Sequence, residues 1–176
     1  IIPARALNEL ARVASDGEES IYMVSPKNRG QVLFRVKDVE VVSQLIDGTF
    51  PDYSRVIPTA NDKLLKIDPK SFSEGVDRVA TIATEKTRAV KMALDKDKIT
   101  LSDTSPENGT AAEEVPGSYS DDSFEIGFNA RYLLEVLGVI DTPQVVLETT
   151  RSDRPGVFRP VGTGPEEFTH VIMPMQ

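Results

Sequence analysis

Apolar residues recur every three to four positions in three stretches of the chain, which is the spacing of one face of an amphipathic helix. Pro3 precedes the first stretch, Asp68 and Pro69 precede the second, and Asn129 precedes the third. Asp and Asn are favourable N-caps, and proline is tolerated in a first helical turn. Gly17 is a suitable stop for the first helix. We therefore predict helices over about residues 4–16, 69–85 and 130–140.

Short runs rich in Val, Ile, Leu and Phe follow each predicted helix, and Gly, Pro and Asp separate these runs. Runs of this length between such turn residues are typical of antiparallel strands. Each helix is therefore expected to lead into a β-meander, and a short strand is expected before the second and third helices. The predicted strands cover residues 21–24, 31–36, 39–46, 64–67, 88–94, 98–102, 110–115, 124–127, 144–149, 156–161 and 168–173.

An internal repeat links the first and third of these helix-and-meander units. The run ARALNELARV at residues 4–13 matches ARYLLEVLGV at residues 130–139, and Phe34-Arg35 recurs as Phe158-Arg159 at nearly the same offset. The middle unit repeats the same order of elements without obvious identity. Units of this length indicate pseudo-symmetry within domains rather than a solenoid. We predict a half-domain over residues 1–57 and a two-unit domain over residues 58–176.

The segment between these domains, residues 47–58, combines Gly48, Pro51 and Pro58 with several large apolar residues. The glycine and prolines argue against regular structure. A linker this apolar usually packs against another surface.

Composition narrows the possible functions. The 176 residues include no Cys and one His, His170, so a disulfide framework, a thiolate nucleophile and a Cys-based zinc site are excluded. No apolar run reaches the 18 residues of a membrane span. Three pairs of adjacent carboxylates, at 113–114, 121–122 and 166–167, are better explained as solvated acids than as a hydrolase site. We therefore expect no enzyme activity, no cofactor, no metal and no membrane contact, and the lack of Cys fits the cytoplasm.

Charge is unevenly distributed along the chain, whose formal net charge is -8. Residues 63–91 contain seven basic and four acidic residues, whereas residues 95–126 contain two basic and nine acidic residues. Such segregation lets an acidic protein present one attractive face to a polyanion. Ordinary solvated surface explains the same charges when they are taken alone.

Three segments resemble one known family. They are LIDGTFPDYSRVIP at residues 45–58, EIGFN at 125–129 followed by Tyr132-Leu133-Leu134, and HVIMPM at 170–175. All three are similar, at the expected spacings, to the bacterial sliding clamps, the beta subunits of DNA polymerase III. The resemblance covers the whole chain. It begins inside the family's second domain, so residues 1–57 would be the C-terminal half of the middle domain and residues 58–176 the C-terminal domain. Because the chain also starts at Ile1, we expect it to be part of a longer protein.

The resemblance implies an α+β fold of repeated strand-helix-meander units, with helices on one face and antiparallel sheets on the other. It also implies a ring of two chains that encircles duplex DNA without reading its sequence and tethers the polymerase. No bond is made or broken by the clamp. The expected partners are duplex DNA, DNA polymerase III and the clamp loader, the proteins being held through short peptides, together with a second chain in the ring.

The family resemblance assigns candidate residues on the predicted helices. Basic side chains on the helix faces would attract phosphates without sequence specificity. The candidates for DNA contact are Arg5, Arg12, Lys70, Arg78 and Arg131. The candidates for the contact between chains are Ile82 and Arg88.

The resemblance also implies a groove for a partner peptide similar to Gln-Leu-x-Leu-Phe. Methionine suits a surface that accepts several partners, and Arg55 and Asn129 would hold the peptide backbone or its glutamine. From composition alone, the end of the chain is better explained as an apolar tail, and Val56 as a residue that fills the domain boundary. The alternative function is a peptide-binding adaptor without a DNA role. The matching groove positions are Pro51, Arg55, Val56, Asn129, Tyr132, Val171, Ile172, Met173, Pro174 and Met175.

Overall fold

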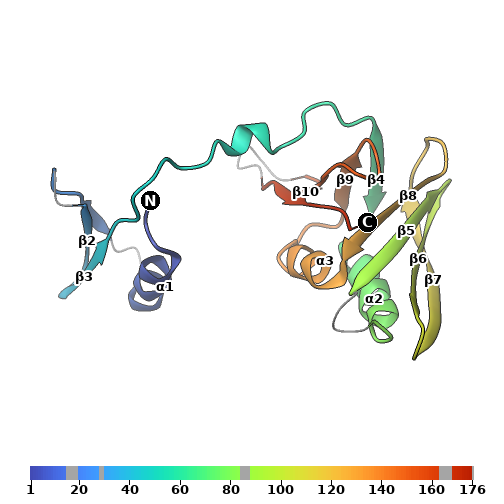
Figure 1. Ribbon diagram of the computed structural model, residues 1–176, viewed down its shortest axis with the longest axis horizontal. Coiled ribbons are helices and arrows are strands. Elements are labelled where there is room, and N and C mark those ends of the chain that lie inside the picture. Colours follow the sequence, from blue (N-terminus) through green and yellow to red (C-terminus); the bar gives the residue numbers. More distant parts are fainter. Residues whose placement is uncertain (15–19, 28–29, 84–87, 163–167, 176) are drawn as a thin grey trace. The chain divides into compact units, whose positions relative to one another are not determined.

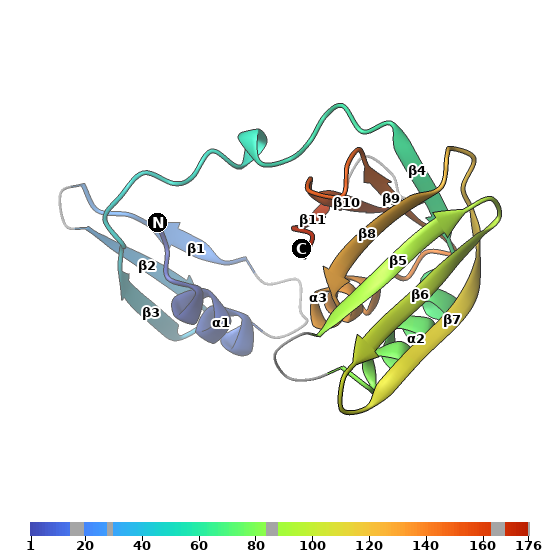
Figure 2. The same ribbon diagram turned by 45° about the vertical axis from the view of Figure 1, so that its right-hand side comes forward.

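The structure is a computed structural model that describes residues 1–14, 20–27, 30–83, 88–162 and 168–175. The chain separates into two compact units, Ile1–Tyr53 and Ser54–Gln176 (Figures 1 and 2). A boundary after residue 57 remains a prediction. The two units are described separately below.

The first unit is one helix followed by a three-stranded antiparallel meander. Helix α1 (Ala4–Val13) precedes β1 (Tyr22–Val24), β2 (Gln31–Val36) and β3 (Val39–Gln44), and the strand order is β1-β2-β3. Leu10 of α1 packs on the alternate, buried residues of β2. The helix ends at Val13 instead of continuing to residue 16, and the predicted stop at Gly17 lies outside the described residues.

The second unit contains two strand-helix-meander repeats, as the sequence pattern predicts. The first repeat comprises β4 (Lys63–Ile67), α2 (Pro69–Ala80), β5 (Ala89–Asp95), β6 (Lys98–Ser105) and β7 (Gly109–Ser118). The second comprises β8 (Phe124–Asn129), α3 (Ala130–Leu137), β9 (Val145–Thr149), β10 (Gly156–Pro160) and β11 (His170–Ile172). A single 3-10 turn, η1 (Tyr53–Arg55), interrupts the linker, which was predicted to have no regular structure.

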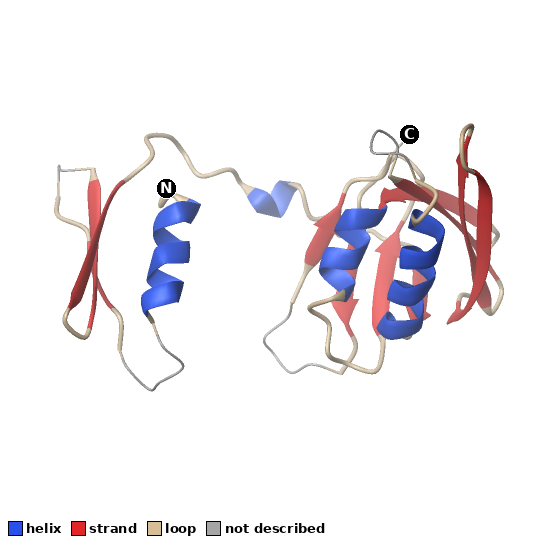
Figure 3. Cartoon of the chain, turned by 90° about the horizontal axis from the view of Figure 1, so that it is seen from below, coloured by secondary structure: helices blue, strands red, loops and turns tan. Residues whose placement is uncertain are grey.

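The two repeats exchange strands. The strand that leads into each helix pairs with the meander of the other repeat, so that β4 lies beside β9 and β8 lies beside β5. The resulting sheet has the order β11-β10-β9-β4-β7-β6-β5-β8. Helices α2 and α3 lie side by side on one face of this sheet (Figure 3). The predicted α+β arrangement, with helices on one face and antiparallel strands on the other, is therefore confirmed.

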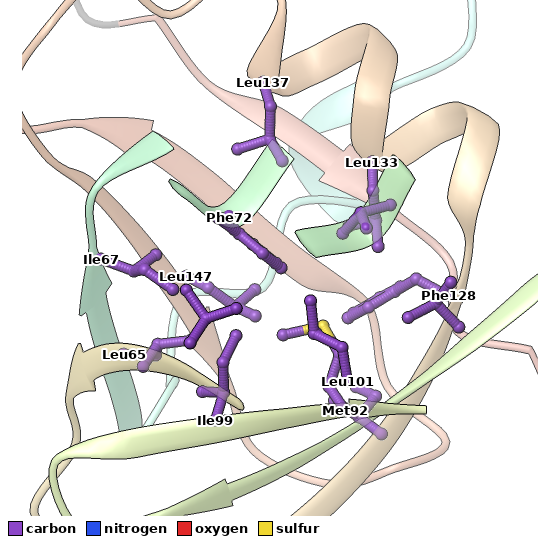
Figure 4. Close-up of a cluster of buried hydrophobic side chains, with 14 of the residues drawn as sticks. Leu65, Ile67, Phe72, Met92, Ile99, Leu101, Phe128, Leu133, Leu137 and Leu147 are labelled. Atoms are coloured by element: carbon purple, nitrogen blue, oxygen red, sulfur yellow. The ribbon is translucent and has the colours of Figure 1, made fainter. Parts of the chain in front are cut away.

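The main core lies between the two helices and the sheet (Figure 4). Phe128 and Phe158 meet edge to face, with ring centroids 5.9 Å apart. Gly156 makes room for this pair, because a Cβ atom at that position would lie 2.6 Å from the Phe128 ring. Overpacking of a dense core costs about 1–3 kcal/mol, so the space is specific to glycine. The residues labelled in Figure 4 that fill this core are Leu65, Ile67, Phe72, Met92, Ile99, Leu101, Phe128, Leu133, Leu137 and Leu147.

Two of the boundaries that differ from the sequence prediction have clear local causes. Helix α2 ends at Ala80, where the Thr81 N–H donates to the Arg78 carbonyl and the chain tightens into a 3-10 turn. The predicted end near Glu85 lies outside the described residues. Strand β7 extends to Ser118 because β6 pairs with it as far as Pro116 and β4 pairs with Gly117 and Ser118.

The start of α2 supplies a pH-dependent contribution to stability. The Asp68 carboxylate accepts a hydrogen bond from the Ser71 backbone N–H at 2.7 Å. This backbone bond, followed by the Ser71 side chain and nearby Lys70, lowers the pKa of Asp68 below its ordinary value. Because the folded-state pKa is the lower one, the stabilisation is present above the unfolded-state pKa and is lost as the pH falls through the folded-state value.

We expect Asp68→Ala to lower the free energy of unfolding by about 1 kcal/mol at neutral pH, because the helix loses its N-cap. Asp68→Asn keeps an equally good cap but removes the titrating group. Urea unfolding at neutral and at acid pH measures both effects. In acid, the free energy of unfolding of the wild type should fall relative to that of Asp68→Asn. A pH-independent gap would contradict this role of Asp68.

Candidate functional site

The five candidate basic residues for DNA contact all lie on the exposed surfaces of helices. Arg5 and Arg12 belong to α1, Lys70 and Arg78 to α2, and Arg131 to α3. Within the second unit, α2 and α3 are neighbours. Two of the five, Arg5 and Lys70, have no ion pair with any described residue.

Arg78 is held against the sheet by a carboxylate that is distant in sequence. Its guanidinium binds both carboxylate oxygens of Glu113 on β7, with Nε 2.7 Å from Oε2, and Glu74 lies 3.8 Å away. The hydrogen bonds raise the pKa of Arg78 and lower that of Glu113, so both groups are charged. The neighbouring Glu114 points to the opposite face of β7 and pairs with Lys98. Both members of this carboxylate pair therefore have structural partners.

Two more candidate arginines pair within their own helices. Arg12 lies 2.9 Å from Glu9, and Arg131 lies 2.8 Å from Glu135. The hydrogen bond from Arg131 to Glu135 raises the pKa of Arg131. These exposed pairs contribute little to stability. Their relevance is electrostatic, because both Arg12 and Arg131 already have a carboxylate beside them.

The end of the chain presents alternating side chains to the core and to the surface. Ile172 is only 3% exposed and belongs to the core, whereas Met173 is 60% exposed. Val171, Pro174 and Met175 are half-buried. The accessible apolar surface at this point is therefore formed by the side chains on either side of Ile172, and the side chain of Ile172 supports them from within.

A backbone hydrogen bond fixes this tail on the edge of the sheet. The Met175 N–H donates to the Gly127 carbonyl of β8 at 2.8 Å, and the two residues form an antiparallel bridge. A Cβ atom at position 127 would lie 3.3 Å from the Met175 carbonyl oxygen, so glycine allows this close approach. Sequence reasoning missed Gly127. A glycine inside a predicted strand, two residues before the predicted cap Asn129, was a signal that another part of the backbone approaches closely at this point.

Asn129 ends β8, two residues after Gly127, and Tyr132 lies in the first turn of α3. The Asn129 side-chain oxygen accepts a hydrogen bond from the Arg131 backbone N–H at 3.0 Å, so it caps the helix as predicted. Its amide nitrogen is the group that would donate to a peptide. Tyr132 is exposed. The structure thus places the tail and the start of α3 together, as the peptide-groove hypothesis requires.

The linker candidates are divided between the units. Pro51 belongs to the first unit, whereas Arg55 and Val56 belong to the second. All three are exposed, and Val56 is 55% exposed. Arg55 ends the 3-10 turn of the linker. An exposed valine after such a turn is available for contact with a partner.

Ile82 and Arg88, the candidates for the contact between chains, flank a segment outside the described residues. Ile82 is half-buried, and its carbonyl accepts a hydrogen bond from the Asn108 side chain. Arg88 is exposed with φ of 30°, and its carbonyl accepts from the Ala130 N–H at 2.8 Å. Arg88 also lines a hollow of about 550 Å³ between α2 and α3. Its position is therefore close to the helical face that carries Arg131.

No group of three acidic or histidine side chains suited to a metal ion occurs among the residues that the structure describes. Within the same residues, no helix is long and apolar enough to cross a membrane.

Comparison with known proteins agrees with this arrangement. The family model for the C-terminal domain of the DNA polymerase III beta subunit matches residues 54–176, and the model for the central domain matches residues 1–52. The beta sliding clamp of Caulobacter vibrioides is 42% identical over 178 residues, covering 100% of this chain and 46% of the relative. The chain thus spans about half the length of the curated relatives that it matches.

Solved structures show the same fold. A sliding clamp from Caulobacter crescentus superposes with a TM-score of 0.91 at 40% identity, and one from Bartonella birtlesii, bound to griselimycin, with a TM-score of 0.92 at 33% identity. Both comparisons cover 100% of this chain and 46% of the solved chain. From the strand-helix-meander repeats, the fixed C-terminal tail and these matches, we conclude that the chain belongs to the family of DNA polymerase III beta subunits, the bacterial sliding clamps.

Proposed function

We propose that this chain forms part of a ring that encircles duplex DNA in the cytoplasm and tethers DNA polymerase III, the clamp loader and other proteins through short peptides. The match of both domains to the clamp family carries this proposal. In this proposal, residues 1–57 are the C-terminal half of the middle domain and residues 58–176 are the C-terminal domain, and no catalytic step and no cofactor are involved.

The DNA role is supported by the exposed helical cations. Arg5, Lys70 and the three paired arginines lie on exposed helical surfaces. Contacts from such side chains to phosphates position a protein on a duplex but do not specify a sequence. Loose contact of this kind suits a tether that must move along its substrate. Ile82 and Arg88 remain the proposed contact with a second chain.

The tethering role is supported by the tail on β8. Val171, Met173 and Met175 offer apolar and polarisable side chains beside Asn129 and Tyr132, and the Gly127 bridge holds them in place. With Arg55 and Val56, which belong to the same unit, they would accept the apolar residues of an extended peptide. The same surface without any DNA contact would make the protein a peptide-binding adaptor, which is the second candidate function.

Two binding measurements separate these functions. The whole chain is titrated against a labelled Gln-Leu-Ser-Leu-Phe peptide, and the full-length, ring-forming chain is loaded on nicked circular duplex DNA at several salt concentrations. We expect peptide binding in the first experiment and salt-sensitive retention in the second, because phosphate contacts release counterions. Peptide binding with no retention of the full-length chain would favour the adaptor. If the chain does not bind the peptide and the full-length chain is not retained on DNA, both candidate functions are excluded.

A further inference from the structure

A row of apolar side chains crosses the outer face of the sheet in the first unit. Val24, Leu33 and Val42 stand opposite one another in register on β1, β2 and β3. They point away from α1, because the intervening residues of β2 form the core with Leu10. Val24 is 53% exposed and Val42 is 62% exposed. Outward faces of antiparallel sheets are usually polar, so this apolar row is unusual for a solvated surface.

The internal repeat identifies the equivalent row in the second unit. Phe34-Arg35 corresponds to Phe158-Arg159, so Leu33 on β2 corresponds to Val157 on β10. Leu33 pairs with Val42 on the following strand, and Val157 pairs with Val171 in the same way. Val42 therefore occupies the position that Val171 occupies in the proposed peptide groove.

The corresponding side chains differ in how far they are covered. Val157 is 0% exposed, although it lies on the outward face and outside the main core, and Val171 is half-buried. Leu33 is half-buried, and both of its neighbours in the apolar row are mainly exposed. The first unit thus has apolar residues at the positions equivalent to those of the second unit, but these residues are more exposed to solvent.

A hollow of about 500 Å³ adjoins the apolar row and has a mixed polar rim. Arg35 and Glu40 lie 3.8 Å apart across β2 and β3 on the same outward face. The rim contains two basic residues and one acidic residue, so its net charge is positive. Two copies of this surface facing each other would bring like charges together, which argues against self-association. The lining residues are Tyr22, Val24, Leu33, Arg35, Lys37 and Glu40.

We propose that the apolar row and this hollow form a second docking surface for an extended peptide with alternate apolar residues and an adjacent acidic residue. Neighbouring strands lie about 4.8 Å apart, so the row of three side chains spans about 10 Å. Alternate side chains of an extended peptide are about 6.6 Å apart, and two of them fit along this row. The comparison of Val42 with Val171 rests on the proposed function. The exposure of the apolar row, the register of its strands and the charge of the rim do not depend on that function.

The test uses the whole chain with isotope-labelled backbone amides and the synthetic peptide Glu-Gln-Leu-Ser-Leu-Phe. We expect saturable shifts of amide signals in β1–β3 as well as in the C-terminal tail. Val42→Glu should weaken binding at the first unit by about tenfold or more, because it places a charge in the apolar row. Val42→Ile is the matched control and should retain binding. Arg35→Glu should weaken binding of this peptide more than binding of a version with Gln in place of Glu.

Met173→Ala separates this inference from the proposed function. Shifts in β1–β3 that persist in Met173→Ala support the second surface, even where the tail no longer responds. Shifts confined to the second unit of the wild type would overturn the second surface and leave the proposed groove intact. Loss of all shifts in Met173→Ala, or no binding to either unit, would also overturn it. So would peptide-independent dimerisation that Val42→Glu abolishes, because a second copy would then be the occupant.

Discussion

Full-length, ring-forming clamps with Arg5→Glu and Arg131→Glu are expected to leave circular DNA faster than the wild type at moderate salt. Both residues are exposed on helices. Each phosphate contact contributes about 0.9 to the slope of log affinity against log salt, so losing two contacts should reduce that slope by about 2. Retention is measured as the half-life of labelled clamp on nicked circular DNA over a series of salt concentrations.

Two controls make this result specific. Lys91→Glu with Lys98→Glu changes the net charge by the same amount on strands β5 and β6, away from the helices. This control pair should retain DNA nearly as well as the wild type. Arg131→Glu also places two carboxylates four residues apart with Glu135, which costs a few tenths of a kcal/mol, so thermal unfolding is compared first. Equal retention of the wild type and the Arg5→Glu, Arg131→Glu variant at low salt would contradict contact between these helices and DNA.

Loss of peptide binding is the second large effect that we expect. Met173 and Val56 are mainly exposed, so replacing both by alanine should leave the fold intact. In a complex each side chain becomes buried, and truncation removes about 1–2 kcal/mol of apolar contact per residue. The affinity for a Gln-Leu-Ser-Leu-Phe peptide should therefore fall about 30-fold or more. Fluorescence anisotropy with labelled peptide measures this change.

Val139→Ala provides a matched control for the peptide experiment. Val139 is 64% exposed just after α3 and lies outside the proposed groove. Its truncation removes the same atoms as Val56→Ala but should leave peptide affinity unchanged. If the Met173→Ala, Val56→Ala variant binds as tightly as the wild type, the groove is not formed by these residues.

The sequence predicts local features of this chain better than contacts between distant residues. Asp68 and Asn129 were recognised as helix caps because the residues that they cap lie within one turn. The pair Arg78–Glu113 was not foreseen, because its members are 35 residues apart and meet only when α2 packs on β7. The exchange of β4 and β8 between repeats was missed for the same reason, since periodicity does not specify strand partners.

The candidate site was predicted in part. Surface exposure of Met173 and Tyr132 and the position of the tail beside α3 agree with the groove hypothesis. The burial of Ile172 follows from strand alternation and limits its side chain to a supporting role. The roles of all the groove, DNA and chain-contact candidates remain predictions, because they concern molecules that bind to this chain.

The strand exchange in the second unit has a mechanical consequence. Each meander holds the strand that leads into the other repeat's helix, through the β4–β9 and β5–β8 ladders. Tension that pulls the two meanders apart would have to break the β5–β8 ladder together with one of the two ladders of β4, which pairs with β9 on one side and with β7 on the other. The domain would therefore resist stretching as one cooperative block.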